Sequence, residues 1–338
     1  MPCVLTGDIS IMRKALVTGG AGFVGRHLIK RLLEEGYEVH CVDSLMQGTG
    51  AIDPRRTGQW PLYSPCDYQN FHFYDEDCRD YFRRVKDDDF DYAFHLAAVV
   101  GGRWMIENRP LAVADDLSID SQYWQWAVET KPKKTVCFSS SAAYPVSYQC
   151  RENFVLLKEE MISFERDLGM PDMSYGWAKL THEFLAKLAY EKYGIKSVSY
   201  RPFSGYGEDQ DDSYPFTGIC KRALSLIDKS VLRVWGDGNQ MRDFIHIEDC
   251  IQGILMTMDR IDNGDALNLS TGIFTSFKTL ATMIAMECGF TPEVCGMSDK
   301  PAGVFARAGD TSKQEAYGFC DKISLEAGVS RAIRFLNP

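Results

Sequence analysis

The sequence has few of the features that mark proteins which bind nucleic acid, cross membranes or hold metal ions. No cluster of lysine and arginine accompanies its formal net charge of -10, so there is no basic footprint to release the counterions of a nucleic acid. No apolar run approaches the ~18 residues that a membrane helix needs. The 11 cysteines form no CxxC pair and no Cys/His ligand spacing, and their odd number suits free thiols in a reducing compartment. We therefore expect a cytoplasmic protein with no metal, nucleic-acid or membrane partner.

Length and composition are those of an ordinary globular protein. At 338 residues the chain is long enough for about two domains, because most domains hold about 100 to 200 residues. The hydrophobic fraction of 45% and the charged fraction of 25% are typical of chains that fold around a core. The first dozen residues, MPCVLTGDISIM, lack the basic start and the apolar core of a signal peptide, and we expect them to be a short lead-in.

The N-terminal part of the chain alternates short apolar runs with segments of helical spacing. The runs that predict strands are Lys14–Thr18, Glu38–Val42, Phe71–Tyr74, Tyr92–Leu96, Thr135–Phe138 and Ser197–Tyr200. The segments that predict helices include Val24–Glu35, Leu111–Glu129 and Tyr175–Tyr193. This alternation indicates an α/β fold with a doubly wound parallel sheet covered by helices on both faces. After Arg201 the alternation weakens, which predicts a smaller second lobe, and Gly48–Asn70 reads as a long polar insertion.

A glycine-rich segment, ALVTGGAGFVGRHL, lies between the first predicted strand and the first predicted helix. It sets Gly19, Gly22 and Gly25 in a GxxGxxG spacing, which allows a tight turn, a close approach to a pyrophosphate and helix-on-strand packing. Asp43 ends the second strand 18 residues beyond Gly25. Its carboxylate suits the two ribose hydroxyls of NAD and would repel the 2′-phosphate of NADP. The alternative is an aspartate that only caps a loop.

Other candidate cofactor residues follow from the same geometry, because ligands of open α/β sheets bind at the carboxyl ends of the strands. Simple packing would explain the pair of alanines among them equally well. These candidates flank the glycines or end the third and fourth strands: Phe23, Val24, Asp77, Cys78, Leu96, Ala97 and Ala98.

The segment SYGWAK predicts a catalytic pair on one face of a helix, because Tyr175 and Lys179 are four residues apart. A phenol is a poor base at neutral pH, but a neighbouring ammonium and a positive nicotinamide ring would both lower its pKa. Tyr175 would then accept a proton from a sugar hydroxyl that Ser140, at the end of the preceding strand, holds in line. The alternative is an amphipathic helix with a core tyrosine and a solvated lysine.

Together TGGAGFVG, HLAA, FSSSAAYP and SYGWAK resemble the extended short-chain dehydrogenase/reductase superfamily, among its nucleotide-sugar epimerases and dehydratases. The resemblance runs from Ala15 to about Phe335 and places the family's serine, tyrosine and lysine on Ser140, Tyr175 and Lys179. It implies a Rossmann-type NAD-binding domain of residues 13–203 plus 247–275, and a nucleotide-sugar-binding lobe of residues 204–246 plus 276–338. Relatives are commonly homodimers packed through two helices, which here would be Leu111–Glu129 and Tyr175–Tyr193.

The predicted substrate residues also come from this resemblance. RPFSGYG, WGDGNQMRDFIHIEDC and KPAGVFARAGD are similar to the family's nucleotide-sugar-binding segments, and AAVVGG resembles GDP-mannose 3,5-epimerases. The sequence departs from the family where an asparagine becomes Ser204 and where an asparagine pair becomes Asp115 and Asp116. The resemblance assigns to the substrate Gly101, Gly102, Ser204, Arg242, Arg307 and Asp310.

The alanines in FSSSAAYP bear on the reaction. The 3,5-epimerases have an acid/base cysteine where this chain has Ala142, and the Asp-Glu pair of the 4,6-dehydratases would fall on Ser141 and Ala142. The glutamate of the sugar-acid decarboxylases is missing too. Because a 4-epimerase needs no such extra base, the sequence favours transient oxidation at sugar C4 followed by hydride return to the other face.

Other reactions on the same fold stay open. A nucleotide-sugar 4-dehydrogenase also needs no extra base. A 4,6-dehydratase or 3,5-epimerase would need a base from elsewhere, such as Asp211, Tyr214 or His246. A non-catalytic NAD-binding scaffold is a further alternative, since a fold does not imply a function.

Overall fold

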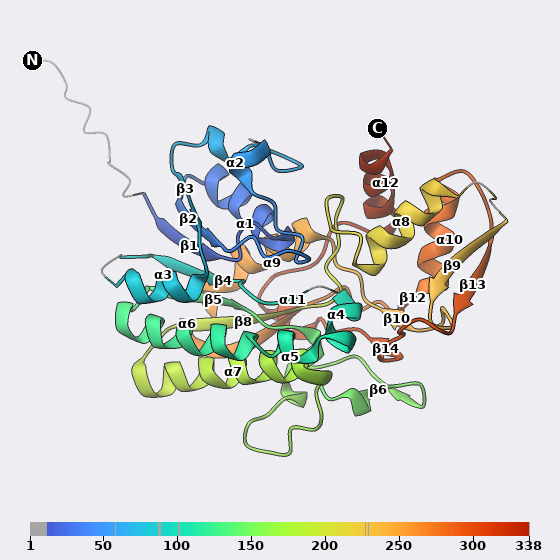
Figure 1. The fold of residues 1–338 in the computed structure, drawn as a ribbon. Coiled ribbons are helices and arrows are strands. Elements are labelled where there is room, and N and C mark those ends of the chain that lie inside the picture. The colour runs from blue at the N-terminus through green and yellow to red at the C-terminus, as the bar shows by residue number, and fades with distance from the viewer. Residues whose placement is uncertain are drawn as a thin grey trace, which may run out of the picture.

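The computed structural model describes residues 12–57, 59–86, 89–100, 102–226, 228 and 230–337. The expected N-terminal lead-in lies largely outside these residues, and so does Gly101. Figure 1 shows a large sheet with helices on both faces and, beside its carboxyl-terminal edge, a smaller group of helices and short strands. No helix in the described part of the chain combines the length and apolarity of a membrane span. The cysteines that the structure describes are all free.

The large sheet confirms the doubly wound fold. Its seven strands follow the order β11-β8-β5-β4-β1-β2-β3, and every neighbouring pair is parallel. The chain leaves β1 in one direction to β2 and β3, and returns to its other side at β4, so the carboxyl ends of β1 and β4 form a switch point. The strands are β1 (Lys14–Thr18), β2 (Glu38–Asp43), β3 (Phe71–Asp75), β4 (Tyr92–His95), β5 (Lys134–Phe138), β8 (Ser197–Pro202) and β11 (Asn263–Leu269).

Helices cover both faces of this sheet (Figure 1). On one face, α1 (Phe23–Glu34) and α9 (Ile247–Thr257) pack against side chains such as Val39 and Phe94. The opposite face holds α3 (Cys78–Arg84), α6 (Asp116–Thr130) and α7 (Met173–Tyr193), whose core includes Tyr81, Tyr123 and Ala186. Full burial of such side chains on two faces explains why the strands read as continuous apolar runs.

One predicted helix is wrong in its extent. Leu111–Glu129 is not continuous: α5 (Pro110–Val113) ends before a turn, and α6 begins at Asp116. The carboxylates at this turn bind other elements, because Asp115 pairs with Arg79 and Asp116 accepts from the backbone amide of Val99. These contacts hold the chain at the break and start a new helix there.

The insertion after β2 packs on its own chain. It contains α2 (Pro54–Thr57) and a 3₁₀ turn at Pro65–Asp67. Trp60 is 2% exposed and donates its indole N–H to the carbonyl of Ile52, while the Tyr63 hydroxyl donates to the carbonyl of Arg26 in α1. The expected insertion therefore covers the outer side of α1.

The smaller group of elements has a core of its own, formed by α8, α10, α12 and the β9–β13 pair. A three-stranded sheet in the same part of the chain has the order β12-β10-β14. Its elements are α8 (Pro215–Ser225), β9 (Val231–Trp235), β10 (Met241–Arg242), β12 (Thr275–Ser276), α10 (Phe277–Glu287), β13 (Glu293–Met297), β14 (Ala306–Arg307) and α12 (Leu325–Leu336). The remaining elements are α4 (Gly102–Asn108), the β6 (Gln149–Cys150) and β7 (Asn153–Phe154) hairpin, α11 (Ser312–Ala316) and 3₁₀ turns at Ser141–Ala143, Val146–Tyr148, Glu159–Met161 and Met258–Arg260.

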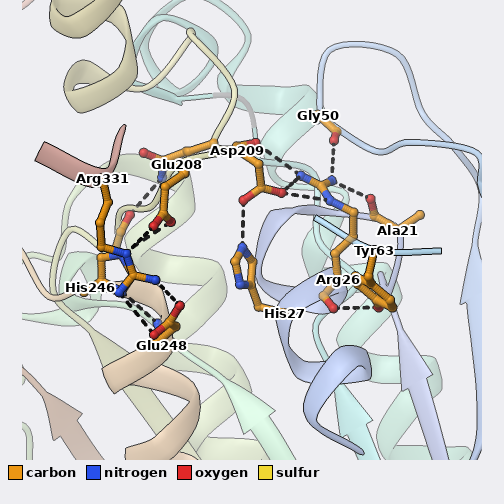
Figure 2. A network of polar contacts seen from close by, with 12 residues as sticks. Ala21, Arg26, His27, Gly50, Tyr63, Glu208, Asp209, His246, Glu248 and Arg331 are labelled. Carbon is orange, nitrogen blue, oxygen red and sulfur yellow. Dashed lines mark hydrogen bonds and ion pairs between the residues drawn. The ribbon is translucent and has the colours of Figure 1, made fainter. Parts of the chain in front are cut away.

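Two ion-pair groups fasten the loop that follows β8 to both parts of the molecule (Figure 2). Asp209 accepts from Arg26 at 2.8 Å and contacts His27 at 2.7 Å, and both of these residues belong to α1. The adjacent Glu208 accepts from Arg331 of α12 at 2.6 Å. Arg26 and Asp209 are almost fully buried. Their ion pair therefore anchors the loop that follows β8 to α1.

Candidate functional site

A cavity of about 480 Å³ lies at the carboxyl ends of the parallel strands, between the large sheet and the smaller group of elements. It brings together most of the predicted residues from segments far apart in the chain. Those that line it are Gly19, Gly22, Phe23, Val24, Gly25, Asp43, Asp77, Cys78, Leu96, Ala97, Ala98, Gly102, Ser140, Tyr175, Lys179, Ser204, Arg242 and Arg307.

Two predicted residues lie elsewhere. Asp310 does not line the cavity; its carboxylate accepts from the backbone amide of Ser312 at the start of α11, a local cap. The alternative base His246 is fully buried and accepts from the amide of Glu248 at the start of α9. Short polar side chains next to a helix start commonly cap it, and the sequence pattern did not distinguish this use from substrate binding.

The glycine loop has backbone positions that only glycine fills easily. Gly19 has a φ of 70°, and a Cβ atom there would lie 2.7 Å from the amide nitrogen of Ala97. At Gly25, a Cβ atom would lie 2.5 Å from the Cα of Gly20. Gly22 is the N-cap of α1 and provides no side-chain cap. The first amides of α1 thus face the cavity and fit the pyrophosphate of a dinucleotide.

Asp43 ends β2 and is 9% exposed. One carboxylate oxygen accepts from the amide of Ala21 at 3.0 Å and the other from the amide of Leu45 at 2.8 Å. Burial raises the pKa of this carboxyl, and the two amides and Arg26 oppose the rise. Each oxygen keeps a further lone pair that can accept from a ribose hydroxyl, so the residue fits NAD.

Asp77 has a partner already. It caps α3 by accepting from the amide of Arg79 at 2.8 Å, and the Arg79 guanidinium pairs with the same carboxylate at 2.7 Å. That hydrogen-bonded pair lowers the pKa of Asp77. Cys78, beside it, is buried, and burial raises the pKa of its thiol. These residues form the wall of the cavity at the end of β3, with the Asp77 carboxylate held by Arg79.

Ser140, Tyr175 and Lys179 meet on one side of the cavity. The Ser140 hydroxyl, just beyond β5, accepts from the amide of Ala142 at 3.1 Å. Tyr175 and Lys179 leave the same face of α7, and the lysine Nζ lies 5.8 Å from the centre of the tyrosine ring. Burial raises the pKa of Tyr175, while the Lys179 ammonium pulls it down. The ammonium thus acts on the phenol in the expected direction.

A buried group of charged side chains lies behind Lys179, and the sequence did not identify it. Asp116 is 1% exposed; one oxygen accepts from Val99 at 2.5 Å, and the other has no hydrogen-bond partner among the described residues. Burial raises its pKa to about 7, against the effect of Lys179. Burial opposes the charge on Lys179, but Tyr175, then Asp120 and Asp116, favour the ammonium and raise its pKa.

The same group contains a His–Asp–His arrangement. Asp120 contacts His95 and His182 at 3.1 Å each. Burial opposes a charge on His182, but Asp120 raises its pKa to about 10, whereas burial lowers the pKa of His95 to about 4. The ligand atoms of the three residues lie within 4.8 Å of one another, close enough for a metal ion to bridge. Both imidazoles contact Oδ1 of Asp120, and its Oδ2 has no hydrogen-bond partner among the described residues. Because Asp120 raises the pKa of His182, we interpret the arrangement as an ion pair between these two residues.

The substrate side of the cavity is rich in arginine. Arg242 donates to the carbonyls of Met241 and Val304 at 2.7 and 3.0 Å, and Arg307 pairs with Asp172 at 2.9 Å. Asp172 also pairs with Arg103, a residue that no sequence pattern singled out. The position of Arg103 directly after the glycines of AAVVGG was the only available signal.

The loops that close this side contain the remaining candidates. Gly102 has a φ of 66°, and a Cβ atom there would lie 2.7 Å from the carbonyl oxygen of Ser213. Ser204 has a φ of 36°, a region that asparagine adopts more readily than serine. The alternative bases Asp211 and Tyr214 line the cavity, and burial raises the pKa of Tyr214.

Comparison with known proteins agrees with this geometry. Residues 15–270 match the family model described as "NAD dependent epimerase/dehydratase family". The match spans most of the chain, so the protein belongs to this family of NAD-dependent enzymes, and its cofactor is NAD.

Individual relatives act on nucleotide sugars. The chain is 27% identical over 332 residues to a putative UDP-glucose 4-epimerase of Methanocaldococcus jannaschii, covering 95% of this chain and 97% of the relative. It is 26% identical over 324 residues to GDP-mannose 3,5-epimerase 1 of Oryza sativa subsp. indica, covering 93% and 79%. A solved mutant of the UDP-glucuronic acid 4-epimerase of Bacillus cereus, with NAD and a fluorinated UDP-sugar bound, is similar with a TM-score of 0.79, 25% identity and coverage of 96% and 98%.

Proposed function

We propose that the protein is an epimerase of a nucleotide-diphosphate sugar that acts through transient oxidation at sugar C4. One observation supports this proposal above all. Ser140, Tyr175 and Lys179 line one cavity with the glycine loop, whereas position 142 beside the serine is alanine. The groups for oxidation and reduction at one carbon are therefore present, and the acid/base side chain that other reactions use next to the serine is absent.

The other carboxylates of the cavity do not replace that base well. Asp172 lies one helical turn before Tyr175, but burial is outweighed by Arg307 and Arg103, which lower its pKa. Asp77 is paired with Arg79. Asp211 accepts from the amide of Ser213 at 2.9 Å. The lowered pKa values of Asp172 and Asp77 make these two carboxylates weak bases, which disfavours proton removal from C3 or C5 by either of them.

The chain's own groups divide the work at C4. Ser140 holds the C4 hydroxyl in line with Tyr175, which takes its proton and later gives it back. Lys179 keeps a positive charge beside the phenol and stabilises its ionised form. Bound NAD would supply the hydride acceptor for C4 and the hydride donor for the return step, and the glycine loop and Asp43 would hold it. Arg242 and Arg307 hold the diphosphate while the sugar turns over.

A second candidate function rests on Tyr214. This residue lines the cavity, so it stands where a base for a 4,6-dehydratase or 3,5-epimerase would be needed. Burial raises the pKa of Tyr214, and no ammonium group opposes this rise as Lys179 does at Tyr175, so the Tyr214 phenol keeps its proton at neutral pH and cannot act as a base. Net oxidation by a 4-dehydrogenase would use the same three residues as the epimerase and differs only in the fate of the hydride.

We also propose the organisation of the chain. Residues 13–203 with 247–275 would form the NAD-binding domain, because α9 and β11 pack on or join the large sheet. Residues 204–246 with 276–338 would form the substrate lobe. A cytoplasmic homodimer would pack through α6 and α7, whose outer faces expose Leu117, Trp177 and Phe184 by 42%, 44% and 41%.

The test is to incubate the purified protein with NAD and UDP-, GDP-, CDP- or dTDP-sugars. The absorbance of reduced nicotinamide and the proton spectrum of the sugar are followed together. An epimerised sugar without lasting reduced cofactor supports the proposal and identifies the substrate. Accumulating reduced cofactor with a keto sugar would instead indicate a dehydrogenase, and a 4-keto-6-deoxy product a dehydratase.

A further inference from the structure

Three guanidinium groups converge at the substrate end of the cavity, although only two were expected there. Arg103 comes from α4, Arg242 from β10 and Arg307 from β14, and all three line the cavity. Gly303 lies between the first two: a Cβ atom there would be 3.3 Å from Arg103 Cζ and 3.2 Å from Arg242 Nη2. Three arginines from segments far apart in the chain thus bring their positive charges together at the substrate end of the cavity.

The carboxylates at this place do not balance that charge. Asp172 contacts Arg103 at 2.9 and 3.0 Å and Arg307 at 2.9 Å, so one carboxylate serves two guanidiniums. Glu107 accepts from Arg103 Nε at 2.5 Å, one turn along α4. In the described part of the chain Arg242 pairs with no carboxylate, and burial together with Arg307 and Arg103 lowers its pKa to about 9.

Each guanidinium also keeps unused donors. Among the described residues, Nη2 of Arg103, Nη1 of Arg307 and Nε of Arg242 have no acceptor. Asp172 and Gln149 fix the orientation of Arg103 and Arg307 without using these N–H groups. Prepositioned donors with excess positive charge suit a ligand that has several anionic oxygens, and a diphosphate is such a ligand.

We propose that Arg103 is a third diphosphate-binding residue of the substrate site, acting with Arg242 and Arg307, and that Asp172 holds Arg103 and Arg307 in position for it. This inference rests on the proposed function for the nature of the ligand. Arg103 lies in α4, whereas Arg242 and Arg307 lie in β10 and β14. The diphosphate would therefore be bound by residues from three separate elements. It also means that affinity should depend on the second phosphate.

The experiment measures binding to the full-length, NAD-saturated protein by isothermal titration calorimetry. UDP, GDP, CDP and dTDP are titrated first, and the tightest of them is then compared with its monophosphate. Arg103→Gln is expected to weaken the diphosphate about 10- to 100-fold, the loss of a charge-assisted hydrogen bond, and to weaken the monophosphate less. Arg103→Lys should lie in between, because lysine keeps the charge without the fork.

The matched control is Arg109→Gln, which removes the same charge from an exposed arginine next to α4 that does not line the cavity. It should leave both affinities unchanged. Thermal unfolding and NAD affinity are measured for each variant, and if Arg103→Gln does not fold, Arg103→Lys decides the matter. An unchanged ratio of diphosphate to monophosphate affinity, or no binding of any nucleoside diphosphate, would overturn the proposal.

The outcome is separable from that of the sugar assay. If Arg103 governs diphosphate binding but no sugar is epimerised, the third arginine stands and the epimerase proposal fails. If a sugar is epimerised by wild type and by Arg103→Gln with equal KM, the epimerase stands and the role of Arg103 is wrong. A true binding role should raise KM far more than it changes kcat.

Discussion

On the cofactor side of the cavity, the groups proposed to bind NAD come from short contiguous segments: the glycine loop with the start of α1, and Asp43 at the end of β2. On the substrate side, Arg103, Asp172 and Arg307 come from places far apart in the chain and act only through their mutual contacts. The cofactor side depends on backbone geometry, whereas the substrate side depends on side-chain charges. Substitutions should therefore affect the two sides by different mechanisms.

The largest effect is expected at Tyr175, where the two sides meet. Tyr175→Phe removes the hydroxyl that exchanges the proton and should lower kcat on the order of 100- to 10,000-fold. Because the phenyl ring keeps the packing, NAD and nucleoside diphosphate affinities should stay within about twofold of wild type. Steady-state kinetics with calorimetry checks both. A large loss of affinity for NAD or for the nucleoside diphosphate would show that Tyr175 serves to bind that ligand rather than to transfer the proton.

Gly19 tests the dependence on backbone geometry. Gly19→Ala places a methyl group in a left-handed conformation, 2.7 Å from the backbone of Ala97, and should cost about 1–3 kcal/mol of stability. NAD affinity should fall as the loop shifts, while diphosphate affinity at saturating NAD changes little. Urea unfolding and NAD titration measure the two effects. Gly36→Ala is the matched control, since Gly36 also has a positive φ but nothing within 4 Å. An equal loss of NAD affinity in both variants would contradict the argument.

Asp116 should make stability depend on pH. Burial raises its pKa to about 7, above the value of about 3.9 in an unfolded chain. The native state therefore holds this proton more tightly, and the carboxyl's contribution to stability, complete below about pH 4, is lost as the pH rises through about 7. Asp116→Asn avoids that loss, so its free energy of unfolding relative to wild type should increase by about 1–3 kcal/mol from about pH 4 to about pH 8.

Urea unfolding across this pH range checks the prediction, with Asp115→Asn as the partly exposed control. A difference between wild type and Asp116→Asn that stays constant with pH would contradict it. Asp116 lines neither the cofactor side nor the substrate side of the cavity, but its charge helps to keep Lys179 protonated. The result therefore shows how a residue outside both sides affects the protein.

The smallest effect is expected at Asp43. Asp43→Asn removes the charge that would repel a 2′-phosphate, and its side chain keeps one acceptor oxygen where Asp43 offers two, one to the amide of Ala21 and one to that of Leu45. We expect NAD affinity to fall several-fold and the preference for NAD over NADP to shrink by about 10-fold, roughly 1.4 kcal/mol. Competition titration with both dinucleotides measures this. An unchanged preference would show that shape, rather than charge, excludes NADP.

Sequence reasoning predicted the two sides unequally well. Strand and helix periodicity identified the parallel sheet and α7, and the glycine spacing identified the loop, because these signals are local. It joined α5 and α6 into one helix, since the break is set by contacts of Asp115 and Asp116 with distant residues. Sequence reasoning also missed Arg103, because the contact of this residue with Asp172 joins two positions that are far apart in the chain. It also assigned Asp310 to the substrate, although this residue does not line the cavity and its carboxylate accepts from the nearby amide of Ser312.

The most direct test of the account is to run the epimerisation in deuterated water and to read the product by proton and deuterium spectra. Oxidation and reduction at C4 alone return the substrate's own hydride, so the account predicts an inverted C4 and no deuterium on any sugar carbon. Chemistry at C3 or C5 must exchange a carbon-bound proton with solvent through a base. Deuterium at C3, C5 or C6 of the product would contradict the proposal that the reaction takes place at C4 alone.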